Sequence, residues 1–282
     1  MNLKWLSFFL FLLMLFPLIG VSAAAEDASE LSLYVINVRK ADALLLRSGS
    51  TAYLIDTGSE DSFPALLKAL REEGINRLDG VILTHTHSDH AGGLSYLLDS
   101  DIAVDQVYAS GYFNKKEKKH PAVAALKGTG REVVFLLSGD TLPLDGGTLE
   151  VLGPLVKDDE AENNNSLVLL ASGGGGTMLL TGDMEFPEEE TLLSAGLISH
   201  ADVLKIANHG ESDATGESLV AAVSPSVAVI STNSDDEPDT PAGRVIKLLK
   251  KYGIPVYLTE ETESGILVTL KDGKVTVESR IE

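Results

Sequence analysis

Three histidines and one aspartate are concentrated in a six-residue stretch within the first third of the chain. His85, His87, Asp89 and His90 belong to the segment T-H-T-H-S-D-H (84–90), which directly follows an apolar run. Alternate residues at a strand end face the same side, so His85 and His87 can point together. The turn that follows can bring Asp89 and His90 to a neighbouring point. Imidazole nitrogen and carboxylate oxygen are suitable ligands for Zn²⁺ or Mn²⁺, and this spacing therefore predicts a metal site.

A metal site of this kind supplies its own nucleophile, because a bound water loses a proton near neutral pH. The chain has no cysteine, which excludes thiolate catalysis, cysteine-ligated zinc and disulfides. It also has no G-x-S-x-G segment, the usual setting of a hydrolase serine. The chemistry that these residue types predict is hydrolysis by metal-activated water.

The segment needs a rigid element before it and a close turn after it. The apolar run Val81 to Leu83 predicts a short buried strand that leads directly into the histidines. A helix from about His90 to Leu98 is expected next, and Gly92 and Gly93 permit close approach of the backbone.

A weak internal repeat suggests how distant residues could join this site. The segments Y-L-I-D-T-G-S-E-D (53–61) and L-L-T-G-D-M-E-F (179–186) each end a strand on an acid and precede a helix. Each is followed by a strand that delivers a histidine, His85 in the first half and His209 in the second. Two similar halves predict two sheets with helices outside, with the site at the strand ends between them.

The remaining elements fit the same α/β pattern of short strands and helices. Strands are expected at 31–38, 43–46, 52–55, 106–109, 133–137, 148–152, 167–171, 177–180, 203–206, 227–230, 256–258, 266–270 and 275–278. Helices are expected at 63–70, after Pro121, and at 188–193, 217–223 and 242–252. The four glycines 173–176 predict a hairpin turn rather than a phosphate-binding loop, because they open a strand and not a helix.

Composition limits the kinds of partner. The chain has 282 residues, 44% of them hydrophobic, and a formal net charge of −20. This length and hydrophobic content suit a single α/β domain with a large core. The negative charge opposes general nucleic-acid binding, because phosphate neutralisation dominates that affinity. The lysines of N-K-K-E-K-K-H (114–120) are a local exception, for which a solvated loop is the simpler interpretation.

The first 25 residues have the pattern of an export signal. Lys4 precedes an almost continuous apolar run from Trp5 to Ile19, and small residues lead to a predicted cleavage after Ala23. The alternative is an uncleaved membrane anchor, since Trp5 to Ala25 is just long enough to span a bilayer. Both interpretations predict a secreted or extracytoplasmic protein with its hydrolase domain at 26–282 and no other membrane contact.

The chain resembles the metallo-β-lactamase superfamily, whose signature is His-x-His-x-Asp-His after a buried strand. The similarity covers nearly all of residues 31–280. Within the superfamily the chain is most similar to the extracytoplasmic hydrolase domain of the ComEC competence proteins. The supporting segments are V-I-N-V-R-K-A-D-A-L-L-L (35–46), Y-L-I-D-T-G (53–58), N-N-N-S-L-V-L (163–169), L-L-T-G-D (179–183) and A-D-V-L-K-I-A-N-H-G (201–210). The resemblance implies a four-layer αββα sandwich of two mixed sheets.

The resemblance also implies a role for each residue of the site. His85 and His87 would hold one cation, and Asp89, His90 and His209 would hold a second. Asp183 would bridge the two cations. Asp89, Asp183 and Lys205 would take part in catalysis, and Lys205 would do so by contacting a substrate phosphate. Asp56 would orient the ligand loop and Asp42 would support the floor of the site, although turn capping is the plain alternative for both.

Several positions depart from the family pattern. Most members supply a further histidine to the first cation, but here the segment is E-A-E-N-N-N-S (160–166), so Glu162, an asparagine or water would take that place. The first cation should then bind more weakly or favour Mn²⁺ over Zn²⁺. Other departures from the ComEC pattern are Asn208, Glu211, Thr240, Arg39 and Ala41. His120 and His200 are interpreted as ordinary surface residues.

Three functions remain open at this point. The leading hypothesis is hydrolysis of a phosphodiester in single-stranded DNA or a nucleotide. The second is hydrolysis of an acyl bond, as in a lactam or lactone. The third is a non-catalytic, exported metal-binding module.

Overall fold

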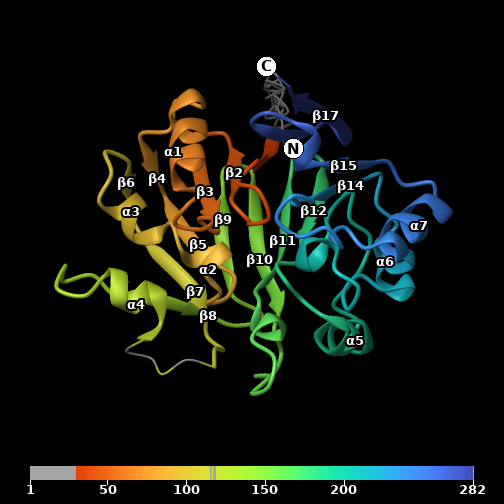
Figure 1. Ribbon diagram of the computed structural model, residues 1–282, viewed down its shortest axis with the longest axis horizontal. Helices are drawn as coiled ribbons and strands as arrows, with labels where there is room; N and C mark the ends of the chain where they lie inside the picture. The colour runs from red at the N-terminus through yellow and green to blue at the C-terminus, as the bar shows by residue number, and fades with distance from the viewer. Residues whose placement is uncertain (1–29, 115, 117–118, 282) are drawn as a thin grey trace, which may run out of the picture.

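The computed structural model describes residues 30–114, 116 and 119–281, which form two stacked β-sheets with helices on both outer faces (Figure 1). The predicted signal segment, residues 1–25, lies outside this range, as do Lys115 and Lys118 of the lysine run. Among the described residues, no helix has the length and apolar character needed to cross a bilayer.

The first sheet has eight strands, antiparallel on one side and parallel on the other. Their order is β17 (Lys274–Arg280), β16 (Gly265–Lys271), β1 (Leu31–Ile36), β2 (Leu44–Ser48), β3 (Thr51–Ile55), β5 (Gly80–Leu83), β7 (Val107–Ser110) and β8 (Val133–Leu136). From β3 to β8 neighbouring strands run parallel, and the others pair antiparallel.

The second sheet is mixed in the same way. Its order is β15 (Val256–Leu258), β14 (Val227–Ile230), β13 (Val203–Lys205), β12 (Gly176–Leu180), β11 (Val168–Gly173), β10 (Gly147–Gly153) and β9 (Thr141–Leu144). Strands β12 to β15 run parallel. A separate pair, β4 (Arg77–Leu78) and β6 (Ala103–Val104), lies beside the first sheet.

Three apolar layers hold the sandwich together. The central layer joins inward residues of both sheets, such as Leu33 and Leu46 with Leu169 and Leu180. On the outer face of the first sheet lie α1 (Phe63–Glu72), α3 (Leu94–Leu98) and α4 (Pro121–Ala125). On the outer face of the second sheet lie α5 (Phe186–Ser194), α6 (Glu217–Val223) and α7 (Gly243–Lys251). The predicted αββα arrangement of two mixed sheets is confirmed.

The helix predicted from His90 to Leu98 is interrupted. It forms α2 (Ser88–Ala91) and then α3, with Gly92 and Gly93 between them. A Cβ atom on Gly93 would lie 2.3 Å from the carbonyl oxygen of Thr57, so the backbones approach more closely than any side chain permits. The glycine pair thus breaks the helix where the chain packs against the loop after β3.

His120 is not the surface residue that the sequence suggested. Its side chain is buried, its ring packs edge-on against Phe113 and Phe135, and its Nδ1 accepts a hydrogen bond from the Ala122 amide. It therefore begins α4 and fills an apolar layer. His200 keeps an exposed side chain, which agrees with the prediction.

Candidate metal centre

Four strand ends deliver the predicted site residues to one place. Asp56 follows β3 and His85 follows β5, and these two strands are parallel neighbours. Asp183 follows β12 and His209 follows β13, which are parallel neighbours in the second sheet. The repeat noticed in the sequence thus corresponds to two equivalent pairs of strands, whose loops face each other across the sandwich.

One cluster contains four potential ligands from both halves of the chain. Nε2 of His90 lies 3.1 Å from Oδ2 of Asp183, and Nε2 of His209 lies 3.6 Å from that same oxygen and 3.6 Å from Oδ2 of Asp89. The ligand atoms of Asp89, His90, Asp183 and His209 all lie within 4.8 Å of one another. Two imidazoles and two carboxylates at this separation can surround a single divalent cation.

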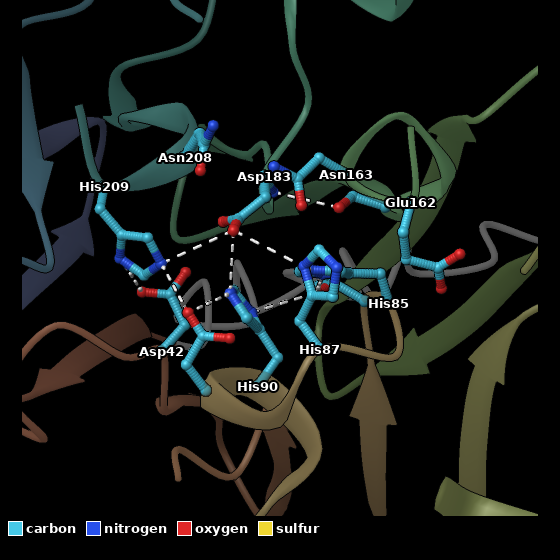
Figure 2. Close-up of polar contacts among 12 residues, drawn as sticks. Asp42, His85, His87, His90, Glu162, Asn163, Asp183, Asn208 and His209 are labelled. Carbon is cyan, nitrogen blue, oxygen red and sulfur yellow. Dashed lines mark hydrogen bonds and ion pairs between the residues drawn. The ribbon is translucent and has the colours of Figure 1, made fainter. Parts of the chain in front are cut away.

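A second pair of imidazoles lies beside this cluster. Nε2 of His85 is 3.0 Å from Nδ1 of His87, and it is 3.9 Å from Oδ2 of Asp183. Asp183 therefore lies between the two histidine groups, as Figure 2 shows. His85 is buried and His87 is exposed, so this side of the centre opens toward solvent.

Asp56 fixes the orientation of His90 from inside the fold. Its Oδ2 lies 2.8 Å from Nδ1 of His90, and its two oxygens accept hydrogen bonds from the amide and the hydroxyl of Thr84. With Nδ1 donating to this carboxylate, Nε2 of His90 is left as the ligand atom. Asp56 holds a left-handed backbone conformation with φ 60°, which aspartate tolerates better than most residues.

His209 is held in place by a constrained turn. It and Asn208 both adopt left-handed conformations, with φ 53° and 47°. The Asn208 amide donates to the Gly182 carbonyl, and Nδ1 of His209 lies 3.0 Å from the Ser231 carbonyl oxygen. This contact directs Nε2 of His209 toward Asp183 and Asp89. Backbone conformations of this kind are typical of sites whose surroundings over-determine them.

Burial and charge set the protonation of the cluster. Burial lowers the pKa of His90, but the carboxylates of Asp183 and Asp56 outweigh it and hold that pKa well above its usual value. Burial and the neighbouring His90 instead lower the pKa of His85, so this imidazole is neutral. Burial raises the pKa of Asp183, but His90 and His209 outweigh it and hold that pKa well below the ordinary range.

Two buried ligand atoms show that the donor set suits a cation. In the described part of the chain, Oδ1 of Asp183 and Nε2 of His209 have no hydrogen-bond partner. Buried polar atoms without partners are rare because each costs about 1–3 kcal/mol. A divalent cation would satisfy both atoms and replace the protons that the carboxylates otherwise draw onto the histidines.

Comparison with known proteins identifies the family. The model of the metallo-beta-lactamase superfamily matches residues 36–234. The chain belongs to the metallo-beta-lactamase superfamily. Membership places it among metal-dependent hydrolases and implies divalent-metal binding, for which the cluster of Asp89, His90, Asp183 and His209 is the candidate site.

Several curated relatives match most of this chain. The chain is 28% identical to ComE operon protein 3 of Bacillus subtilis over 263 residues, which is 89% of this chain and 34% of the relative. It is 30% identical to Recombination protein 2 of Haemophilus influenzae over 223 residues, 77% of this chain and 26% of the relative. The chain thus spans only about a third or less of these proteins.

A solved structure of the superfamily shows the same fold. The metallo-beta-lactamase fold protein YhfI of Bacillus subtilis superposes with a TM-score of 0.57 at 15% identity, covering 86% of this chain and 99% of that one.

Lys205 does not occupy the position expected of a phosphate contact. It is fully buried, and its Nζ lies 3.0 Å from Oδ2 of Asp42 and 3.2 Å from the Ile206 carbonyl oxygen. Because this ammonium has no exposed surface, it cannot touch a substrate. Oδ1 of Asp42 lies 4.0 Å from Nδ1 of His209, so the ion pair lies beneath the metal centre.

The segment that lacks the usual superfamily histidine forms a short 3₁₀ turn, η2 (Asn163–Asn165). The carboxylate of Glu162 is engaged elsewhere, because it accepts hydrogen bonds from the Thr86 hydroxyl and the Asn114 amide. Figure 2 shows it pointing away from the histidines.

Sequence reasoning missed two groups near this turn. The Ser166 hydroxyl accepts a hydrogen bond from the Asp183 amide, and Glu185 accepts one from the Asn163 side chain. The run of asparagines was a signal for the second contact only, because the first involves no asparagine side chain.

Proposed function

We propose that this protein is an exported metal-dependent hydrolase that cleaves phosphodiester bonds in single-stranded nucleic acid or nucleotides. One observation carries the proposal: the carboxylate of Asp183 lies between the His85–His87 pair and the cluster of Asp89, His90 and His209. Such an arrangement suits two neighbouring cations. Two curated relatives, Recombination protein 2 of Haemophilus influenzae and Competence protein ComA of Neisseria gonorrhoeae, support nucleic acid as the substrate class.

Bound Zn²⁺ or Mn²⁺ would supply an activated water and offset the charge that develops on the phosphate. The protein contributes placement of the ligands. Asp56 orients His90, the Ser231 carbonyl orients His209, and burial keeps His85 neutral and ready to bind. Because Lys205 is buried, bound cations rather than this lysine would offset the charge of a substrate phosphate. General affinity for nucleic acid is expected to be low, because the chain has a net charge of −20.

Export is proposed from the signal-like pattern of residues 1–25. The test is N-terminal sequencing of protein secreted by its own host, which should begin at Ala24. An intact Met1 in membrane-bound protein would favour the anchor instead.

The activity test uses purified protein with Mn²⁺ or Zn²⁺ and labelled single-stranded DNA. Acid-soluble product should appear with the wild type and fall at least a hundredfold in Asp89→Ala, which removes a ligand. The surface variant His200→Ala should retain full activity. Metal-loaded protein that cleaves no phosphodiester but opens a lactam or lactone would replace this proposal with acyl hydrolysis, and loaded protein inert toward all of them would favour a metal-binding module.

A further inference from the structure

The three consecutive asparagines of η2 differ in how their side chains are used. Asn164 accepts a hydrogen bond from the Glu185 amide and donates to Asp158. Asn165 accepts from the Asp158 amide and donates to the Asp158 carbonyl. In both side chains the amide oxygen and the amide nitrogen thus form hydrogen bonds that stabilise the turn. Asn163 is different, because its amide nitrogen is bonded while its oxygen is not.

The orientation of the Asn163 amide is fixed by its neighbour. Its Nδ2 lies 2.9 Å from Oε1 of Glu185, and a carboxylate accepts hydrogen bonds but donates none. The nitrogen must therefore face Glu185, which turns Oδ1 to the opposite side. Figure 2 shows this oxygen on the side of the His85 and His87 rings, next to Asp183.

The Asn163 oxygen is also buried without a partner. Among the side-chain atoms that the structure describes, it belongs to the small set that are inaccessible to solvent and make no hydrogen bond. Oδ1 of Asp183 belongs to the same set. A buried carbonyl oxygen left unpaired costs about 1–3 kcal/mol, and a cation between these groups would remove that cost.

We propose that the amide oxygen of Asn163 is a protein ligand of the cation held by His85 and His87, with Glu185 as the residue that positions it. This proposal rests on the metal centre of the proposed function and names the group that takes the place of the absent histidine. An amide oxygen is a harder ligand than imidazole and suits Mn²⁺ better than Zn²⁺. The first site should therefore prefer Mn²⁺ more strongly than a site with three histidines.

The test measures cation binding directly, in protein stripped of metal and titrated calorimetrically with Mn²⁺. The wild type should bind two ions. Asn163→Ala should weaken one of the two sites tenfold or more, since even hydrogen-bond partners of metal ligands contribute that much, and it should leave the other site unchanged. Asn163→Asp retains an oxygen ligand but loses the donor to Glu185, so it should keep both ions.

The matched control is Glu162→Gln, which changes a neighbouring carboxylate engaged with Thr86 and Asn114. It should bind both ions with wild-type affinity. Wild-type binding by Asn163→Ala overturns the proposal, and so does equal weakening by Asn163→Ala and Asn163→Asp, which would mean that only the bond to Glu185 matters. Weakening by Glu162→Gln alone would assign the ligand to Glu162.

These measurements need no substrate. A protein that binds two ions as described but cleaves no phosphodiester would refute the proposed function and leave the Asn163 assignment standing.

Discussion

The ammonium of Lys205 lies 3.0 Å from Oδ2 of Asp42, and neither side chain reaches solvent. The other oxygen of Asp42 has no hydrogen-bond partner within the described residues and lies 4.0 Å from His209. Burial raises the pKa of Asp42, but the charges of Lys205, His209 and His90 together outweigh it and hold that pKa below its usual value. The pair thus places a charged carboxylate beneath the metal centre and balances it from inside the fold.

Lys205→Met should destabilise the protein by about 3–5 kcal/mol, because it leaves the charge of Asp42 buried and uncompensated. Urea unfolding in the presence of a chelator measures this loss apart from metal binding. The double variant Asp42→Asn with Lys205→Met removes both charges and should recover most of it. A loss below about 1 kcal/mol in the single variant would contradict a buried ion pair.

Asp56→Asn should lower metal affinity tenfold to a hundredfold, because the carboxylate that orients His90 becomes a neutral amide. Asparagine accepts the left-handed conformation of this position, so the backbone should be retained. A competition titration with a coloured zinc chelator gives the affinity. The control is Asp140→Asn. In the wild type the Asp140 carboxylate also accepts a backbone hydrogen bond, from the Leu137 amide, but it does so in a surface turn. Equal metal affinities for the wild type and both variants would rule out a role for Asp56 in orienting the ligand.

The ligand group could be predicted from sequence because it is local and regular. His85, His87, Asp89 and His90 follow one apolar strand, and the repeat of strand, acid, helix and strand placed Asp183 and His209 at equivalent strand ends. Periodicity of the apolar residues also located most strands and helices. These signals depend on residues that are close in the sequence, so they can be recognised without a structure.

Contacts between distant segments could not be predicted in this way. Lys205 is polar and ends a strand. Its sequence neighbours do not indicate that Asp42, 163 residues earlier, forms an ion pair with it. His120 is buried because Phe113 and Phe135 close around it. Strands β4, β6 and β9 are too short to show a clear periodic pattern, and they form because a neighbouring strand offers hydrogen-bond partners.

Glu188 gives the protein a pH-dependent stability that is separate from the metal centre. It is buried in α5, and its Oε1 accepts a hydrogen bond from the Leu155 amide. Burial raises its pKa to about 7, and that hydrogen bond offsets only part of the effect. Because the pKa is higher in the folded state, the neutral form favours folding. Its contribution is complete below about pH 4.5 and is lost as the pH rises through 7.

Glu188→Gln keeps an acceptor for Leu155 but cannot ionise, so its advantage over the wild type should grow between pH 5 and pH 8. One pKa unit corresponds to about 1.4 kcal/mol, and screening by nearby solvent reduces the effect, so the gain should be on the order of 2 kcal/mol. Urea unfolding at both pH values measures it. Glu190→Gln, exposed on the same helix, should show no such change. If the wild type and Glu188→Gln differ by the same amount at both pH values, Glu188 is already ionised in the folded protein at pH 5.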